Sequence, residues 1–398
     1  MNIDTKFKRG LALTAMAAAS AVMLTGCGGG GGDNKAEVVK IGFIAPITGN
    51  NAALGVGMKN SADLAVKHAN ASGKYPYKFE LVVVDDASDP STAVAAANKL
   101  ITDKAVVASG GHFNSGCSLA TAPVFHKNGM AFLVSAAIHP DITGKGYKEI
   151  NRIITEAKAQ NVYAGSLAAK EWGVKTICLI NDRTDYGKTN AGQFGENAVK
   201  NGAQVLSDDG INVGQQDFSA VLTNIKAKNP DCVYFGGMAT EAALIKRQMA
   251  DLQINCLFLS DSGIISDTFN KIAGPAAEGM IAFNIGKPLE DLPGGKKFME
   301  DYAAAKYPEP YDNLGHFGYD TVMMLCDVIG KNKVGTDRKK AIEALRKAEY
   351  DGVLGKTSFD ENGQTKNTLI TTYISKDGKW VAYEKSGLQV KDKQIVAK

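Results

Sequence analysis

Short apolar runs and segments of helical periodicity alternate along most of the chain, beginning near residue 38. The first round predicts strands at 38–46, 79–86, 105–111 and 130–136. It predicts helices at 54–71, 90–103 and from residue 115 onward. Asp89-Pro90 supplies an N-cap and a first helical residue for the second of these helices. Nearly continuous apolar strands between helices are typical of a parallel, doubly wound sheet.

A second round of the same pattern begins near residue 157. Its helices are expected at 161–172, 188–201, 218–228 and 241–252. Its strands are expected at 176–182, 203–212, 231–237, 255–261 and 279–285. Two rounds of similar size predict an α/β protein with two doubly wound, mainly parallel-sheet lobes. Ligands bind such sheets at the carboxyl ends of the strands, so two facing lobes would share one site.

The remainder of the chain has a different pattern. Three helices are expected at 294–306, 315–330 and 337–348. Two apolar segments, 368–375 and 379–384, then flank Asp377-Gly378. A turn pair of this kind between two strands predicts a hairpin with a type I′ turn.

The N-terminus has the features of a secretory signal peptide. Lys6, Lys8 and Arg9 precede an uncharged stretch at 11–24. That stretch would make a helix of roughly 21 Å, shorter than the hydrocarbon core of a bilayer. The following residues, Leu-Thr-Gly-Cys, resemble the bacterial lipobox. The resemblance implies that residues 1–26 are removed and that Cys27 is lipidated, whereas the alternative is an ordinary cleavage site with an incidental cysteine.

The segment 27–36 predicts a flexible tether. It contains the glycine run 28–32, followed by polar residues that cannot bury apolar surface. Lipid chains on Cys27 would give stable attachment to a membrane. We therefore expect a periplasmic or cell-surface protein held by a lipid anchor.

Charge and size exclude several classes of protein. The net charge is +3, and removal of residues 1–26 lowers it to +1, because three positive charges and one negative charge are lost. A nearly neutral body argues against binding of nucleic acid, which favours a basic surface. No later window is long and apolar enough for a membrane span. About 360 residues after the tether predict two domains, each with its own core, and we expect a monomer.

Cysteine usage leaves the redox state open. The body contains five cysteines: Cys117, Cys178, Cys232, Cys256 and Cys326. An odd number leaves at least one free thiol or an intermolecular bond, and most of these side chains are expected to be buried as small hydrophobes. A Cys232–Cys256 bridge is an open alternative if their strands are neighbours.

The motifs of common enzyme classes are absent from the sequence. Gly55-Val56-Gly57 lacks the third glycine of a dinucleotide-binding loop, and no phosphate-binding loop occurs. Ser115 lacks the flanking glycines of a hydrolase nucleophile elbow. The histidines show no metal-binding spacing. We therefore predict a protein that is not an enzyme and that requires no cofactor or metal.

Several segments, in order along nearly the whole mature chain, resemble the periplasmic leucine/isoleucine/valine-binding protein family. These segments are Val39-Lys40-Ile41-Gly42, Thr48-Gly49, 84–90, 93–94, 97–100, Gly111-His112, 144–147, Asp185-Tyr186-Gly187, 217–219, 234–237 and 277–279. The resemblance implies the fold of a type I periplasmic binding protein. It implies one lobe from 37–156 with 286–366, and a second from 157–285 with 367–398, joined by a hinge of three crossings.

The resemblance also implies which residues bind the ligand. Ser115 matches a serine of the first lobe that holds a carboxylate, and its alternative role is a plain N-cap. Ala136, Ala137 and Ile138 match a loop that offers backbone donors and acceptors, although Ile138 is equally consistent with strand-end packing. Tyr186 matches an aromatic residue of the second lobe that closes over the ligand, or packs without contacting it.

Departures from the family pattern concern the ligand's ammonium group. Ile138 and Ser262 replace a hydroxyl residue and a glutamate that hold the ammonium, and Leu54 and Met238 replace aromatics. A buried ammonium without an anionic partner is costly. Either Asp261 substitutes for the missing glutamate, or the ligand is a carboxylate or amide without an ammonium.

One further departure affects a disulfide. The family's small-loop disulfide is also ruled out, because Ser88 and Asn114 stand at its two cysteine positions.

The function predicted from these observations is that of a solute-binding receptor of an ATP-driven importer. Its expected partners are a small-molecule ligand, the transporter permease and the membrane. The ligand expected from the resemblance is an amino acid, most of all a branched-chain one. The alternatives are an ammonium-free carboxylate or amide, and a sensor that reports the ligand to a signalling partner.

Overall fold

The computed structural model describes residues 36–311 and 313–398. Residues 1–26 and Cys27, on which the signal-peptide and lipidation predictions fall, lie outside the described residues. Residues Ala36–Lys398 form one compact unit. Within the described ranges, no helix is long and apolar enough to cross a membrane.

The first sheet has five parallel strands in the order β2-β1-β3-β4-β5. The strands are β1 Glu37–Ala45, β2 Tyr77–Asp85, β3 Val106–Gly111, β4 Ala131–Val134 and β5 Ile150–Arg152. The helices between them are α1 Ala52–Ala71, α2 Pro90–Thr102, α3 Ser115–Lys127 and the short α4 Asp141–Gly144. The predicted cap of α2 is confirmed: the Asp89 carboxylate accepts a hydrogen bond of 2.7 Å from the Thr92 amide.

The second sheet has seven strands in the order β14-β13-β10-β9-β8-β6-β7. Its strands are β6 Thr176–Asn181, β7 Gln204–Gly210, β8 Cys232–Gly236, β9 Leu257–Ser260, β10 Ile281–Ile285, β13 Ile370–Lys376 and β14 Lys379–Ala382. The five earlier strands are parallel, and β13 and β14 add an antiparallel edge. Asp377 and Gly378 both have positive φ, 52° and 72°, which confirms the predicted type I′ turn.

The helices around the second sheet are α5 Ala157–Ser166, α6 Asp185–Lys200, α7 Ser219–Lys228, α8 Ala239–Asp251 and α9 Asp267–Ala273. Two predicted helix starts were wrong by three or four residues. The helix expected from 161 begins at Ala157, and the helix expected from 188 begins at Asp185. In the second case Thr184 is the N-cap, since its hydroxyl accepts a hydrogen bond of 3.0 Å from the Gly187 amide. The apolar pattern gave no sign of this cap.

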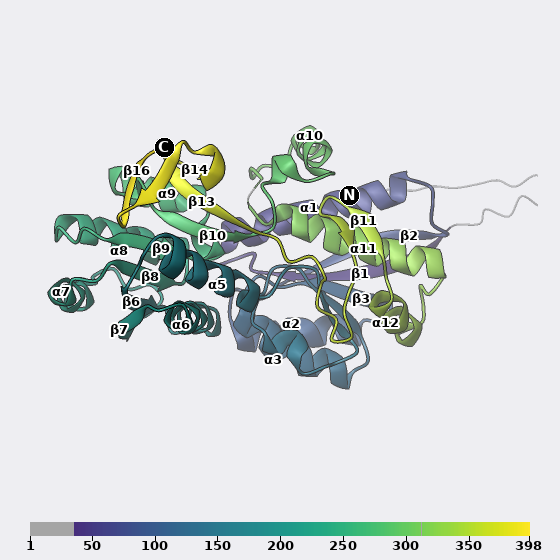
Figure 1. Ribbon diagram of the computed structural model, residues 1–398. Coiled ribbons are helices and arrows are strands. Elements are labelled where there is room, and N and C mark those ends of the chain that lie inside the picture. Colours follow the sequence, from purple (N-terminus) through teal and green to yellow (C-terminus); the bar gives the residue numbers. More distant parts are fainter. Residues whose placement is uncertain (1–35, 312) are drawn as a thin grey trace, which may run out of the picture. The chain divides into compact units, whose positions relative to one another are not determined.

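Three late helices return to the first sheet. They are α10 Gly295–Ala305, α11 Gly315–Asn332 and α12 Arg338–Arg346. Helix α11 packs on α1, β1 and β3, and α12 packs on β3 and β4 (Figure 1). The core of this half therefore joins residues far apart in sequence, such as Met58 and Leu325. The chain then passes to β13 in the second sheet, as expected for the predicted α/β fold with two mainly parallel sheets.

Several short elements were not predicted. They are β5, α4 and α9, the pair β11 Tyr350–Gly352 with β12 Gly355–Thr357, and the pair β15 Leu388–Lys391 with β16 Gln394–Ala397. Residues Leu167–Glu171 form a π-helical turn after α5. Strands of three or four residues are too short for an alternating pattern to identify them.

Candidate ligand-binding site

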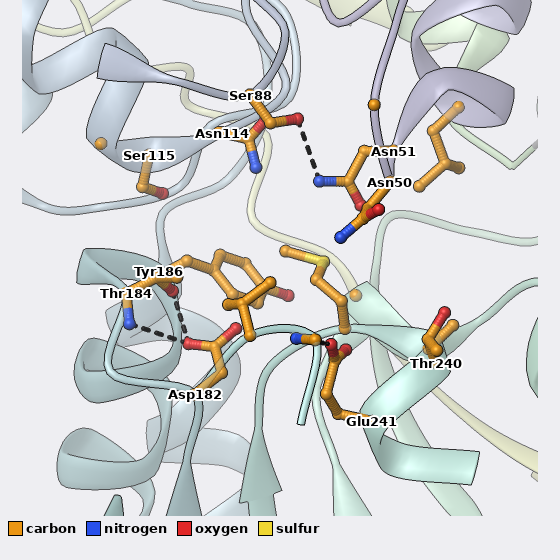
Figure 2. A pocket seen from close by; sticks show the side chains of 18 of the residues that line it. Asn50, Asn51, Ser88, Asn114, Ser115, Asp182, Thr184, Tyr186, Thr240 and Glu241 are labelled. Atoms are coloured by element: carbon orange, nitrogen blue, oxygen red, sulfur yellow. Dashed lines mark hydrogen bonds between the residues drawn. The ribbon is translucent and has the colours of Figure 1, made fainter. Parts of the chain in front are cut away.

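A cavity of about 760 Å³ lies where loops from both sheets meet. One wall is formed by the loops after β1, β2 and β3, and the other by the loops after β6, β7, β8 and β9. Figure 2 shows the polar side chains of both walls pointing toward this space. Every loop in this set follows the carboxyl end of a strand, which is where ligands bind in open parallel sheets.

The first wall contains a helix terminus with an unused hydroxyl. Helix α3 has Asn114 at its N-cap position, but the Asn114 side chain makes no capping hydrogen bond. Ser115 is the first helical residue rather than the cap, and its buried Oγ has no hydrogen-bond partner. The first amides of a helix have no carbonyl one turn earlier to bond to. This wall therefore offers a hydroxyl and backbone N–H donors to an anion.

A buried histidine joins the elements behind this wall. His112 Nδ1 lies 2.8 Å from Asp86 Oδ2, and its Nε2 lies 2.9 Å from Thr121 Oγ1. All three side chains are inaccessible to solvent. The other Asp86 oxygen accepts the Ser88 amide at 3.0 Å. His112 thus links the end of β3, the loop after β2 and helix α3.

The loop after β2 has an unusual backbone. Ala87 and Ser88 both adopt left-handed conformations, with φ of 48° and 60°. Such conformations cost energy for residues other than glycine and persist only where the surroundings hold them. Asn51 donates to Ser88 Oγ at 3.0 Å across the cavity edge (Figure 2). Ser88 lines the cavity, although the sequence analysis did not predict a role for it in ligand binding.

The second wall is acidic. Asp182 Oδ1 accepts hydrogen bonds from the Thr184 amide at 3.0 Å and from the Thr184 hydroxyl at 2.6 Å (Figure 2). Only 2% of Asp182 is exposed. Burial raises the pKa of Asp182, the Thr184 hydrogen bonds oppose this, and the nearby Glu241 charge adds to the rise.

Glu241 and Asp185 complete the acidic set of this wall. Glu241 stands in the first turn of α8 and accepts a hydrogen bond of 2.8 Å from the Gly214 amide. Asp185 is exposed at the start of α6. Arg183 also lines the cavity, but its guanidinium donates to Asn212 Oδ1 at 2.7 Å.

Tyr186 separates Asp261 from the large cavity. The Tyr186 hydroxyl donates to Asp261 Oδ1 at 2.7 Å, and Tyr186 itself lines the cavity. Asp261 also accepts the Gly263 amide at 2.9 Å and the Gly237 amide at 3.3 Å. Burial raises the pKa of Asp261 to about 8. The acceptors of this carboxyl are therefore directed to the protein.

The residues expected from the sequence divide into three groups. Ser115, Tyr186 and Met238 line the large cavity. Ala136 and Ser262 line a neighbouring cavity of about 20 Å³, which Tyr186 also borders. Ala137 and Ile138, like Asp261, are buried and line neither cavity.

A buried arginine holds the loop that contains Ala137 and Ile138. Arg152 is fully buried and donates to the carbonyl oxygens of Ala137, at 3.4 Å, and His139, at 2.6 Å. The Ile138 carbonyl accepts the Ala157 amide at 2.9 Å. The carbonyls of Ala137, Ile138 and His139 are thus engaged within the protein.

The described cysteines are all free, including Cys232 and Cys256. Cys117 lines the large cavity, and burial raises the pKa of its thiol. Among the described residues, no group of His, Cys, Asp and Glu side chains is arranged to hold a metal ion.

Comparisons with known proteins agree with this architecture. A family model described as periplasmic binding protein matches residues 38–379. The chain is 30% identical to Leu/Ile/Val-binding protein homolog 2 of Brucella abortus, over 89% of this chain and 95% of the relative. It is 32% identical to a leucine-, isoleucine-, valine-, threonine- and alanine-binding protein of Pseudomonas aeruginosa, over 85% and 90% of the two chains. A leucine-binding protein from Thermotoga maritima has a similar crystal structure, with a TM-score of 0.79, 30% identity and coverage of 86% and 97%.

Proposed function

This chain belongs to the periplasmic binding protein family, and from that premise we propose that it captures an amino acid outside the cytoplasm for an ATP-driven importer. The observation that carries the proposal is the cavity at the strand ends, where a buried Ser115 hydroxyl without a partner begins helix α3. A ligand carboxylate there would accept from Ser115 and from the first amides of the helix.

The names of the relatives support a branched-chain amino acid as the ligand. Two are named for binding of leucine, isoleucine and valine, one of them also for threonine and alanine, and the third for leucine; identity of about 30% extends over most of each chain. The apolar part of such a ligand would contact Leu54 and Met238, which line the cavity. Micromolar affinity requires only about −8 kcal/mol. A bound carboxylate and a desolvated aliphatic side chain are sufficient for that.

The proposal includes closure of two lobes over the ligand. We assign 37–156 with 286–366 to one lobe, and 157–285 with 367–398 to the other. The late helices α11 and α12 pack on the first sheet, and β13 pairs with β10 in the second, which supports this division. The chain crosses between the lobes three times, and a hinge of this kind allows closure around a ligand.

In the proposed site, Ser115 and the loop Ala136–Ile138 belong to the first lobe, and Tyr186, Met238, Asp261 and Ser262 to the second. In this loop the carbonyls of Ala137 and Ile138 bond to Arg152 and Ala157, so we assign its contact with the ligand to the other backbone groups. Tyr186 covers Asp261 and presents its ring to the ligand.

Attachment to the membrane through Cys27 is a separate part of the proposal. The full chain expressed in a bacterium should carry a lipid on this residue, which mass spectrometry of the N-terminal peptide detects. Cys27→Ser should move the protein from the membrane fraction to the soluble fraction. An unmodified N-terminal peptide would contradict the anchor without affecting the ligand site.

The function is tested by thermal unfolding of the full chain, purified in detergent, with aliphatic amino acids. A ligand at a hundredfold its Kd adds about 2.7 kcal/mol to the free energy of unfolding, which is a clear rise in Tm. We expect L-leucine, L-isoleucine or L-valine to produce that rise. An unchanged Tm with every amino acid tried would contradict the proposal.

A further inference from the structure

We infer that Asp182, supported by Glu241, forms a cation subsite on the second wall, so that the ligand carries a positive group beside these carboxylates. The inference rests on the proposed function and assigns the ligand's ammonium to residues that replace the family's glutamate.

Asp182 has an oxygen that the protein does not use. Both hydrogen bonds of its carboxylate, from the amide and hydroxyl of Thr184, end on Oδ1. Its Oδ2 accepts none, although the side chain is 98% buried and lines the cavity. In Figure 2 one oxygen points to Thr184 and the other into the space between the walls. This oxygen lines the cavity from a side chain that is otherwise buried, so it is positioned to accept a hydrogen bond from a ligand.

The protein supplies no cation for this wall. The cavity is lined by Asp182, Asp185 and Glu241, and among its described lining residues the single basic side chain is that of Arg183. The guanidinium of Arg183 bonds to Asn212 and packs along the end of β7 beside Gly210. Burial and the Glu241 charge both raise the pKa of Asp182, which is the cost that an arriving cation would relieve.

An independent observation on the opposite wall also points to a ligand. Ser115 Oγ is fully buried, lines the same cavity and has no partner. A hydroxyl and a helix N-terminus there suit an anion, whereas the second wall suits a cation. A molecule with a carboxylate at one end and an ammonium beside it satisfies both walls at once.

The two residues that the sequence offered for the ammonium are less suitable. The Asp261 oxygens already accept from Tyr186, Gly237 and Gly263. Ser262 lines the separate, smaller cavity and carries no charge. Asp182 is therefore the carboxylate with an unused oxygen at the site itself.

The test compares L-leucine with 4-methylpentanoate, which is leucine without its amino group. Titration calorimetry of the full chain is carried out on the wild type, Asp182→Asn and Glu241→Gln. Asn keeps the Oδ1 acceptor for Thr184 and removes the charge. Asp217→Asn is the matched control, because Asp217 also accepts from the amide and hydroxyl of the residue two positions later and lies outside the cavity.

We expect the wild type to bind leucine at least about tenfold more tightly than 4-methylpentanoate. Asp182→Asn should remove most of that preference by weakening leucine alone, Glu241→Gln should reduce it less, and Asp217→Asn should leave it unchanged. Equal affinity of the wild type for both compounds would by itself overturn the inference. An unaltered preference of Asp182→Asn for leucine over 4-methylpentanoate would overturn it as well. Binding of neither compound would instead contradict the proposed function.

Discussion

Helices α3 and α6 begin on opposite walls of the same cavity, and their first turns are built differently. At α6 the Thr184 hydroxyl caps the Gly187 amide, and Asp182 in turn holds Thr184. At α3 the residue at the cap position, Asn114, makes no such bond, and Ser115 Oγ is buried without a partner. One terminus is satisfied by its own chain, and the other is left to be satisfied by a ligand.

The two helix N-termini therefore have different roles: the first turn of α6 contributes to folding stability, and the first turn of α3 is available to bind a ligand. A helix whose amides are already capped gains little from an anion, whereas an uncapped one gains a charge-assisted hydrogen bond. Asp182, buried beside the start of α6, makes the contrast stronger, because its carboxylate repels an anion from that terminus. Under the proposed function, the polarity of the cavity would therefore give a bound amino acid one orientation, with its carboxylate toward α3.

The largest expected effect concerns the scaffold of the first wall. His112→Leu leaves Asp86 buried without its partner, so the free energy of unfolding should fall by about 3–5 kcal/mol. Urea denaturation measures the loss. His126→Leu is the control, because the exposed His126–Glu149 pair contributes at most about 1 kcal/mol. Equal small losses in both variants would show that the α3 wall does not depend on the histidine.

A second effect concerns pH and the carboxyl behind Tyr186. The pKa of Asp261 is about 8 in the folded chain, against an ordinary value of 3.8, so between these values the folded chain holds a proton that the unfolded chain has lost. The stability contribution of this group therefore falls as pH rises from about 4 to about 8, by up to about 1.4 kcal/mol per pH unit. Asp261→Asn should make the stability profile flatter between pH 5 and 7. A profile parallel to that of the wild type would exclude this titration.

The third effect separates ligand binding from helix capping. Ser115→Ala should weaken binding of L-leucine by about 1–2 kcal/mol, the contribution of a charge-assisted hydrogen bond. Ser118→Ala is a close control, since Ser118 Oγ is also buried without a partner on α3 but does not line the cavity. If calorimetry finds the same affinity for L-leucine in Ser115→Ala and in the wild type, Ser115 has a purely structural role.

The smallest effect tests the comparison of the two termini itself. Thr184→Ala removes an N-cap and should cost about 1 kcal/mol of unfolding free energy. Asn114→Ala should cost much less, because Asn114 makes no capping bond. Denaturation of the ligand-free chain measures both. A larger loss for Asn114→Ala would mean that the α3 terminus is not open in solution.

Periodicity was sufficient to predict the long elements and the two sheets. The central strands β3, β4 and β8 are wholly buried, so their apolar runs are continuous and easily recognised. The start of α6 was missed because Asp185, Tyr186 and Gly187 carry no apolar period and the signal is the Thr184 cap. The short pairs β11–β12 and β15–β16 were missed for lack of length.

The site was less predictable than the fold. The family resemblance led to Ser115, Tyr186 and Met238, all of which line the cavity. It did not lead to Asp182 or Glu241. A carboxylate after a strand is expected to be exposed to solvent, and only the structure shows that these two are buried. Only their position in the sequence could have indicated a role in binding, since both residues follow strands of the second sheet, where a site was expected.

The central claim is most directly tested by a crystal structure of the full chain with L-leucine. We expect the ligand carboxylate on Ser115 Oγ and the first amides of α3, with the ammonium within hydrogen-bonding distance of Asp182 Oδ2. An ammonium that is remote from Asp182 and Glu241, or a carboxylate on the α6 side, would contradict it.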